Sequence, residues 1–282
     1  MSKPDYIKPK KSLGQNFLKD QNVSRKIVKS LELDSEELCL EIGPGMGALT
    51  KLLSESVNRL YAVDFDEEAI KYLKEELSKE IGSQKISLTH SDIRKIQLSD
   101  ILEQENKNQI KIIGNIPYNL SSEIFFWLFE QSDVIDSAII MIQKELAHRL
   151  TANIGTKDYG ILSLALQMSG TAKRLFDVPP SCFFPQPRVM SSIVKLSFPQ
   201  SDRSSEHFSS MMKLIRTLFN QRRKVIRNTL KNYLALYTGF KIDDLIAKDK
   251  DFIESILGLR PEQLKLDQFE QLLKTIQTVD KS

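Results

Sequence analysis

Cysteine and histidine are scarce in this sequence of 282 residues. Its two cysteines, Cys39 and Cys182, stand far apart in apolar surroundings, and we interpret them as small buried side chains of a protein in a reducing compartment. None of the three histidines has a cysteine or another histidine at the spacing of a metal site. We therefore expect no metal cofactor.

Long apolar runs are also missing. No run approaches the roughly 18 apolar residues that a membrane-spanning helix needs. The segment Met1–Lys11 has lysines but no apolar stretch, and it lacks the Arg-rich amphipathic pattern of an organelle transit peptide. No heptad pattern or interface stripe is visible. We therefore expect a cytoplasmic monomer that does not bind membranes.

Acidic residues are absent from Met212 to Ile242, although the net charge of the whole chain is only +3. A solvated surface usually mixes both signs, so a long segment of one sign favours a polyanionic partner over a helix that merely keeps the protein soluble. The basic residues of this stretch are Lys213, Arg216, Arg222, Arg223, Lys224, Arg227, Lys231 and Lys241.

The first two-thirds of the chain do contain a regular alternation of apolar runs and helical patterns. The helical patterns begin at about Ala48, cover Glu67–Ile81, and cover Ser121–Glu130 with Ser121 as the expected N-cap. This alternation predicts a mostly parallel, Rossmann-like α/β sheet with helices on both faces, which binds ligands at the carboxyl ends of its strands. The predicted strands are Leu38–Ile42, Leu60–Asp64, Ile86–Thr89, Ile110–Gly114 and Ser137–Gln143.

The pattern changes after Val178, where prolines stiffen the chain. Val189–Phe198 alternates as expected of an added antiparallel strand, and a polar linker follows Pro199. Beyond the linker the periodicity is helical. We therefore predict a catalytic domain with an N-terminal arm at residues 1–198 and a small all-helical domain at residues 199–282.

A glycine-rich motif, Glu41–Gly47, joins the first predicted strand to a helix. Glycines at such a turn let the backbone approach a ligand closely. Gly43, Gly45 and Ala48 also satisfy the loose dinucleotide fingerprint, and Asp64 at the end of the next strand suits ribose hydroxyls in either case. The motif alone therefore leaves both a nicotinamide dinucleotide and S-adenosylmethionine open.

Two further positions separate these cofactors. Asp92 follows the third predicted strand, where a carboxylate can accept a hydrogen bond from an adenine amine, although a lone Asp there is more often a cap or turn. Asn115–Tyr118 reads Asn-Ile-Pro-Tyr directly after the fourth strand and resembles the signature of methyltransferases that act on exocyclic amines.

The chemistry of an exocyclic amine explains these residue types. The nitrogen is a poor nucleophile because its lone pair is delocalised into the ring. Acceptors on Asn115 and on the backbone carbonyl beside Pro117 would favour a pyramidal nitrogen, with its lone pair aimed at the methyl group. Pro117 stiffens the turn, and Tyr118 offers a face on which a flipped-out base can stack.

Over nearly its whole length the sequence resembles the KsgA-type ribosomal RNA adenine dimethyltransferases. The stretches that carry the resemblance are Lys10–Leu18, Glu41–Gly47, Asn115–Tyr118, Val178–Pro187 and Phe219–Lys224. The resemblance implies S-adenosylmethionine as methyl donor, with a cofactor site formed by Asn16, Leu18, Glu41, Gly43, Gly45, Asp64, Asp92 and Asn115. It further implies a target base held between Tyr118 and either Phe183 or Phe184, and an rRNA backbone held by Arg222, Arg223 and Lys224.

The implied substrate is a pair of adjacent adenosines in the 3′-terminal hairpin of 16S rRNA in the small ribosomal subunit. Each adenosine would be dimethylated, with a role in subunit biogenesis. Three rival interpretations remain: a large-subunit rRNA methylase of the erythromycin-resistance type, an NAD-dependent oxidoreductase, and a non-enzymatic RNA-binding assembly or transcription factor that has kept the fold.

Overall fold

The computed structural model describes residues 9–10, 13–199 and 204–280, which form two compact units. The first unit comprises Met1–Ala147 and Gly170–Gln200, and the second comprises His148–Ser169 and Ser201–Ser282. None of the helices in the described ranges is both long enough and apolar enough to cross a membrane. The same ranges hold no cluster of His, Cys, Asp and Glu suited to a metal ion.

A seven-stranded sheet with the order β4-β3-β2-β5-β6-β9-β7 forms the centre of the first unit. The five strands β4, β3, β2, β5 and β6 run parallel to one another, whereas β9 runs antiparallel to both β6 and β7. This confirms the predicted α/β class and the added antiparallel strand. The strands are β2 Leu38–Ile42, β3 Arg59–Asp64, β4 Ile86–His90, β5 Ile110–Asn115, β6 Ile135–Gln143, β7 Thr171–Val178 and β9 Ser191–Ser197.

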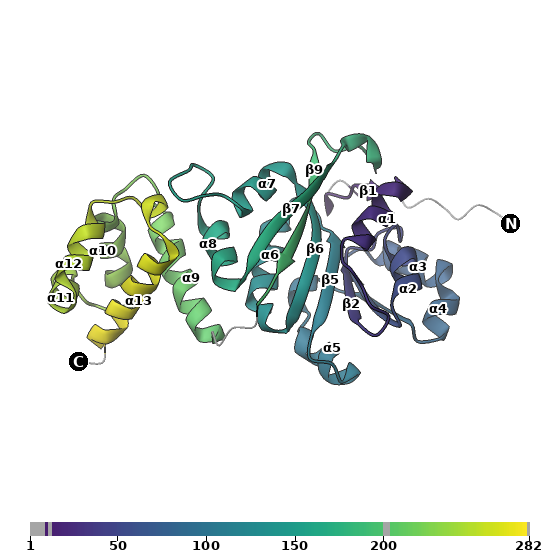
Figure 1. Ribbon diagram of the computed structural model, residues 1–282, viewed down its shortest axis with the longest axis horizontal. Coiled ribbons are helices and arrows are strands. Elements are labelled where there is room, and N and C mark those ends of the chain that lie inside the picture. The colour runs from purple at the N-terminus through teal and green to yellow at the C-terminus, as the bar shows by residue number, and fades with distance from the viewer. Residues whose placement is uncertain (1–8, 11–12, 200–203, 281–282) are drawn as a thin grey trace. The chain divides into compact units, whose positions relative to one another are not determined.

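The central strands are buried on both faces. All five residues of β2 are buried, so this strand reads as a continuous apolar run rather than an alternating one. Figure 1 shows α1, α2 and α3 on one side of the sheet and α6 on the other. The helices of this unit are α1 Gln21–Lys29, α2 Thr50–Ser56, α3 Glu67–Glu76, α4 Ser78–Gly82, α5 Leu98–Glu105 and α6 Ser121–Glu130, and α7 Lys144–Leu150 spans the boundary at Ala147.

Two local predictions about helices were wrong. The pattern over Glu67–Ile81 is two helices, α3 and α4, because the backbone leaves helical geometry at Leu77. Ser121 does not cap α6: Leu120 occupies the N-cap position, and the Ser121 hydroxyl donates to the Pro117 carbonyl at 3.0 Å.

Three strands were not predicted. The edge strand β7 carries Lys173, Arg174 and Asp177, and Val178 is its one buried residue, so it has no long apolar run. The other two, β1 Phe17–Leu18 and β8 Phe183–Phe184, form a separate antiparallel pair, with Phe17 opposite Phe184 and Leu18 opposite Phe183. Two residues are too short a segment to show any periodicity.

The second unit is helical, which confirms the predicted character of the C-terminal region. It includes one segment that the predicted boundary at residue 199 left out, residues 148–169. This segment belongs to the unit because α8 packs against α9 and α13, and because the Tyr159 hydroxyl donates to the Leu264 carbonyl at 3.1 Å. Its helices are α8 Ile161–Ser169, α9 Ser205–Phe219, α10 Ile226–Tyr237, α11 Ile242–Lys248, α12 Lys250–Leu257 and α13 Leu266–Asp280.

Candidate active site

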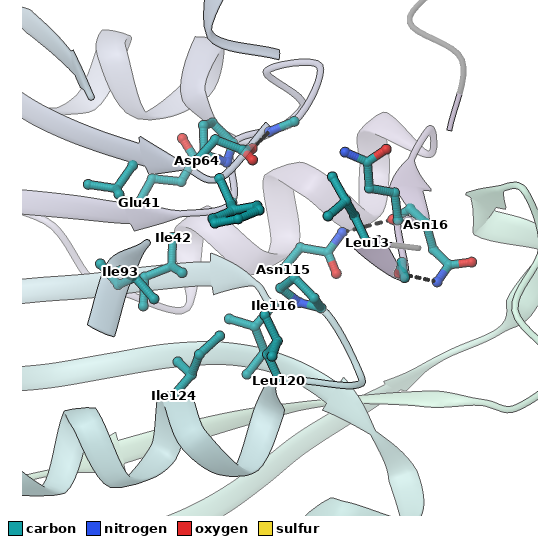
Figure 2. A pocket seen from close by; sticks show the side chains of 18 of the residues that line it. Leu13, Asn16, Glu41, Ile42, Asp64, Ile93, Asn115, Ile116, Leu120 and Ile124 are labelled. Carbon is teal, nitrogen blue, oxygen red and sulfur yellow. Dashed lines mark hydrogen bonds between the residues drawn. The ribbon is translucent and has the colours of Figure 1, made fainter. Parts of the chain in front are cut away.

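A cavity of about 290 Å³ opens at the carboxyl ends of β2, β3 and β5. Glu41, Asp64 and Asn115 reach it from these three neighbouring strands, and Asn16 and Leu13 cover it from the N-terminal arm (Figure 2). The structure thus brings together segments that lie far apart in the sequence. The predicted cofactor and catalytic residues that line the cavity are Asn16, Leu18, Glu41, Gly43, Gly45, Asp64, Asp92, Asn115, Pro117 and Tyr118.

The glycine loop between β2 and α2 is shaped by backbone conformations that favour glycine. Gly43, Gly45 and Gly47 have φ values of 69°, 54° and 80°. A Cβ atom on Gly43 would lie 3.2 Å from the Asn115 carbonyl oxygen, and one on Gly45 would lie 3.0 Å from the Phe17 ring. Glycine therefore lets this loop lie close against both β5 and the arm.

Asp64, the predicted ribose ligand, is held in a fixed orientation at the end of β3. Its Oδ2 accepts a hydrogen bond of 3.0 Å from the Gly45 amide, and its Oδ1 accepts one of 2.8 Å from the Asp66 amide. Burial raises the pKa of this carboxyl above its ordinary value. Each carboxylate oxygen can accept more than one hydrogen bond, so two backbone donors orient Asp64 without using up its capacity.

Glu41 is the most unusual group in the cavity wall. Only 1% of its surface is exposed, and its Oε2 has no hydrogen-bond partner among the described residues. Burial raises the pKa of its carboxyl to about 8. Hydrogen bonds from Thr50 act in the opposite direction. A buried polar atom without a partner is costly, so Oε2 suits a cation or a hydrogen-bond donor from a ligand.

Asp92 has an ionic partner that the sequence analysis missed. It caps a short 3₁₀ turn, Ile93–Lys95, by accepting from the Arg94 amide at 3.0 Å. The Arg94 guanidinium also binds the carboxylate, with Nη2 2.6 Å from Oδ2, and this hydrogen bond lowers the pKa of Asp92. The adenine-amine role predicted for Asp92 therefore requires it to share its oxygens with Arg94.

Asn115 is oriented by the N-terminal arm. Its Nδ2 donates to the Asn16 backbone carbonyl at 3.0 Å, as the dashed line in Figure 2 shows. An amide whose nitrogen faces a carbonyl must direct its oxygen elsewhere. The Oδ1 atom accepts no hydrogen bond from the residues described here, so it is the acceptor that Asn115 offers to the cavity.

The second acceptor is not the carbonyl of Pro117 itself. That oxygen already accepts from the Leu120 amide at 3.1 Å and from the Ser121 hydroxyl at 3.0 Å. The carbonyl of Ile116, which forms the peptide bond to Pro117, accepts no hydrogen bond among those of the described residues, and Ile116 lines the cavity. Ser121 was predicted to cap the helix, but its hydroxyl instead stabilises the turn that precedes the helix.

The aromatic residues predicted to hold the base are placed very differently from one another. Tyr118 lines the cavity, and its hydroxyl lies 2.6 Å from the Ser191 hydroxyl, which fixes the ring. Phe183 is 0% exposed because the β1–β8 pairing sets it opposite Leu18, within the hydrophobic core. Phe184 is 49% exposed. Phe184 is therefore the more accessible of the two phenylalanines, and neither of them lines the cavity.

The three basic residues Arg222, Arg223 and Lys224 of the helical unit also differ in their contacts and exposure. Arg222 donates to the carbonyls of Lys157 and Thr156, at 2.6 and 3.0 Å, so it ties a loop of the unit in place. Arg223 and Lys224 are exposed. Phosphate binding by these three residues stays a prediction: Arg223 and Lys224 are accessible to a partner, while Arg222 also ties a loop of its own unit.

Comparison with known proteins identifies the family. A model described as ribosomal RNA adenine dimethylase matches residues 7–250. The chain belongs to this family. Among curated relatives, the ribosomal RNA small subunit methyltransferase A of Lachnoclostridium phytofermentans is 35% identical over 268 residues, covering 94% of this chain and 91% of the relative. The protein of the same name from Mycoplasma mobile is 38% identical over 263 residues, covering 93% and 96%.

Solved structures agree with this adenine dimethylase assignment. A dimethyladenosine transferase from Plasmodium falciparum is 26% identical and superimposes with a TM-score of 0.76, covering 93% of this chain and 98% of that one. The 23S rRNA methyltransferase ErmE, 22% identical, shares the fold with a TM-score of 0.61 over 93% and 100% of the two chains. Family membership decides between the two cofactor classes that the glycine loop left open, in favour of methyl transfer.

Proposed function

We propose that this protein transfers methyl groups from S-adenosylmethionine to the exocyclic amines of two adjacent adenosines in the 3′-terminal hairpin of 16S rRNA, dimethylating each. The observation that carries the proposal is the orientation of Asn115, whose Nδ2 is held by the Asn16 carbonyl while Oδ1 is left for a substrate. The family match and the names of the curated relatives support the choice of small-subunit rRNA.

The cavity fits S-adenosylmethionine. The unpartnered Glu41 carboxylate suits the cationic methionine part of the cofactor, and Asp64, oriented by two backbone amides, suits the ribose hydroxyls. Gly43 and Gly45 give the backbone close access, and Asn16 and Leu18 would cover the cofactor from the arm. Bound there, the cofactor supplies an electrophilic methyl group on a sulfonium.

The residues beside Asn115 can then activate the adenine amine. Asn115 Oδ1 and the Ile116 carbonyl would accept its two N–H bonds, which favours a pyramidal nitrogen whose lone pair faces the methyl group. Tyr118, its ring fixed through Ser191, would stack on the flipped-out base, with Phe184 as the second aromatic contact. No strong base is required, because the product ammonium loses its proton readily.

The rRNA backbone would be bound by the acid-free segment of the helical unit, in particular by Arg223 and Lys224. We further propose that the protein acts as a cytoplasmic monomer on the assembled or assembling small subunit, and that modification accompanies subunit biogenesis. The proposed methyl transfer uses neither a metal ion nor a membrane.

Methyl transfer from labelled S-adenosylmethionine to purified unmethylated ribosomal subunits tests the proposal, with the modified bases then mapped. We expect label on two adjacent adenosines near the 3′ end of the small-subunit rRNA. Label on large-subunit rRNA instead would assign the protein to the erythromycin-resistance type. Absence of label on either rRNA, by protein that binds the cofactor, would leave only an assembly role.

A further inference from the structure

The N-terminal arm reaches the cavity through an anchor that the proposed chemistry does not use. Two arm side chains, Lys10 and Gln15, converge on the carboxylate of Asp66. Lys10 Nζ donates to Asp66 Oδ1 at 2.7 Å, and Gln15 Nε2 donates to Asp66 Oδ2 at 2.7 Å. The Lys10 amide also donates to Gln15 Oε1 at 2.8 Å, and the three residues are called here the Asp66 clasp. Lys10 Nζ also lies 3.2 Å from Oε1 of the exposed Glu68.

The acceptor of the clasp is buried, although its cationic donor Lys10 is 36% exposed. The side chain of Asp66 is 1% exposed, and hydrogen bonds from Lys10 and Gln15 lower the pKa of its carboxyl despite its burial. A carboxylate withdrawn from water loses much stability when its partners are removed. The arm is therefore strongly favoured in the position that satisfies Asp66.

The clasp is connected by hydrogen bonds to the proposed cofactor residue Asp64 and, through the arm, to the proposed catalytic residue Asn115. The Asp66 amide donates to Asp64 Oδ1, which links it to the ribose carboxylate. On the arm, Asn16 follows Gln15 and its carbonyl holds the Asn115 amide. The next two arm residues form β1, which pairs with β8. One short segment thus touches Asp66, the side chain of Asn115 and the strand that carries Phe184.

We propose that Asp66 is a positioning residue that clamps the N-terminal arm over the cofactor cavity through Lys10 and Gln15. It does not touch the reacting atoms; it fixes the segment that covers the cofactor and orients Asn115. The part of this inference that concerns the cofactor rests on the proposed function. The part that concerns the arm is a property of the protein alone and is measured without ligand.

The test compares Asp66→Asn with Glu67→Gln. Asn is as good an N-cap as Asp, so the bond from the Glu68 amide that caps α3 is retained, while the charge and one acceptor are lost. Glu67 lies in the same helical turn, and its ion pair among the described residues is with Lys71 at 2.9 Å. Its substitution removes the same charge without removing a hydrogen bond to the arm. Lys10→Met and Gln15→Met test the clasp from the arm side and leave the helix cap intact.

Two measurements are made on each variant. Hydrogen exchange of the amides of residues 13–19, without cofactor, should be faster in Asp66→Asn and unchanged in Glu67→Gln. The dissociation rate of S-adenosylhomocysteine should rise roughly tenfold in Asp66→Asn, which corresponds to the loss of one charged hydrogen bond. In turnover, the KM for S-adenosylmethionine should rise by a similar factor, and kcat should fall because the arm also orients Asn115. Lys10→Arg keeps the charge that Lys10→Met removes, so it should retain wild-type values.

Equal exchange and equal dissociation rates in Asp66→Asn, Lys10→Met and the Glu67→Gln control would overturn the clasp. If Asp66→Asn does not fold, the two arm variants decide the question by the same criteria. If the wild-type protein binds no S-adenosylhomocysteine, the proposed function fails, and the exchange measurement alone decides whether Asp66 holds the arm.

Discussion

The Nδ2 atom of Asn115 donates a hydrogen bond of 3.0 Å to the carbonyl of Asn16, which lies 99 residues earlier in the chain. This bond determines which end of the amide is left for a substrate. A side chain that acts mainly as the amine becomes pyramidal contributes more to the chemical rate than to RNA binding.

Replacement of Asn115 should therefore separate catalysis from binding. We expect Asn115→Ala to fold, to bind the small subunit, and to methylate on the order of 100-fold more slowly. Asn115→Asp keeps an acceptor oxygen but sets a carboxylate against the Asn16 carbonyl, so it should retain partial activity. Single-turnover rates and melting temperature, measured on one preparation, check this. A normal rate per folded molecule with a lowered melting temperature would reduce Asn115 to a structural residue.

Glu41 should give the protein an unusual dependence on pH. Its carboxyl has a pKa of about 8 in the folded protein, because burial raises it from 4.5. Between these two values the unfolded chain ionises Glu41 and the folded chain does not, so this group's contribution to stability is present below pH 4.5 and is lost as the pH rises to about 8.

The variant Glu41→Gln removes that titration. Compared with wild type, its free energy of unfolding should improve by on the order of 3 kcal/mol between pH 5 and 8, while its affinity for S-adenosylmethionine falls. Denaturant titrations at several pH values, with calorimetry of cofactor binding, provide the measurements. Parallel stability curves for the two proteins would show that Glu41 is ionised before any cofactor binds.

The two phenylalanines of β8 should respond in opposite ways. Phe183 is fully buried, so Phe183→Ala should cost roughly 3–5 kcal/mol of stability, as for other buried aromatic residues. Phe184 is half exposed, so Phe184→Ala should leave the free energy of unfolding nearly unchanged and slow methylation of RNA. Denaturant titration and single-turnover methylation distinguish them. Normal methylation by Phe184→Ala would mean that the base stacks on Tyr118 alone.

Substitutions of Arg222 and of the pair Arg223 and Lys224 should have different effects, the first on stability and the second on rRNA binding. The pair of changes Arg223→Glu and Lys224→Glu should weaken rRNA binding and reduce its salt dependence by roughly one unit of slope for each lost phosphate contact. Cofactor affinity should not change. The matched control is Lys250→Glu with Lys274→Glu, exposed residues of the same unit outside the acid-free segment.

The change Arg222→Ala should instead lower the stability of the helical unit, because it removes the donors to the Thr156 and Lys157 carbonyls. Binding titrations over a range of salt concentrations, with thermal denaturation, check both expectations. Equal salt slopes for the double variant and its control would refute a phosphate role for Arg223 and Lys224.

The sequence predicted the parallel strands well because the central ones are largely apolar, and because β2 and β5 end in recognisable motifs. Leu38–Ile42 was predicted with the observed bounds, and it delivers Glu41 to the cavity. The sequence could not reveal the contacts that join distant segments. Asp66 lies two residues after Asp64, the carboxylate predicted to bind ribose. Its arm partners Lys10 and Gln15 stand more than fifty residues away in the sequence.

Burial was the second property that the sequence did not reveal. Phe183 and Phe184 are chemically identical neighbours, and only the pairing of β8 with β1 decides which ring enters the core. Arg222 and Arg223 differ in the same way. Arg94 had a detectable signal, a basic residue two positions after Asp92 at a turn, where a side chain can fold back onto the carboxylate it follows.

The pairing of β1 with β8 has a consequence for the timing of repeated methylation. The arm proposed to cover the cofactor is joined to β8 by two residue pairs, Phe17 with Phe184 and Leu18 with Phe183, and the Lys19 amide donates to the Cys182 carbonyl at 2.9 Å. Every spent cofactor must leave from beneath this arm before the next methyl group can be delivered. If the RNA stays bound between transfers, the lifetime of this two-residue ladder would set the interval between successive methylations, and a mutation that shortens it would make the enzyme a faster but less persistent modifier of each RNA molecule.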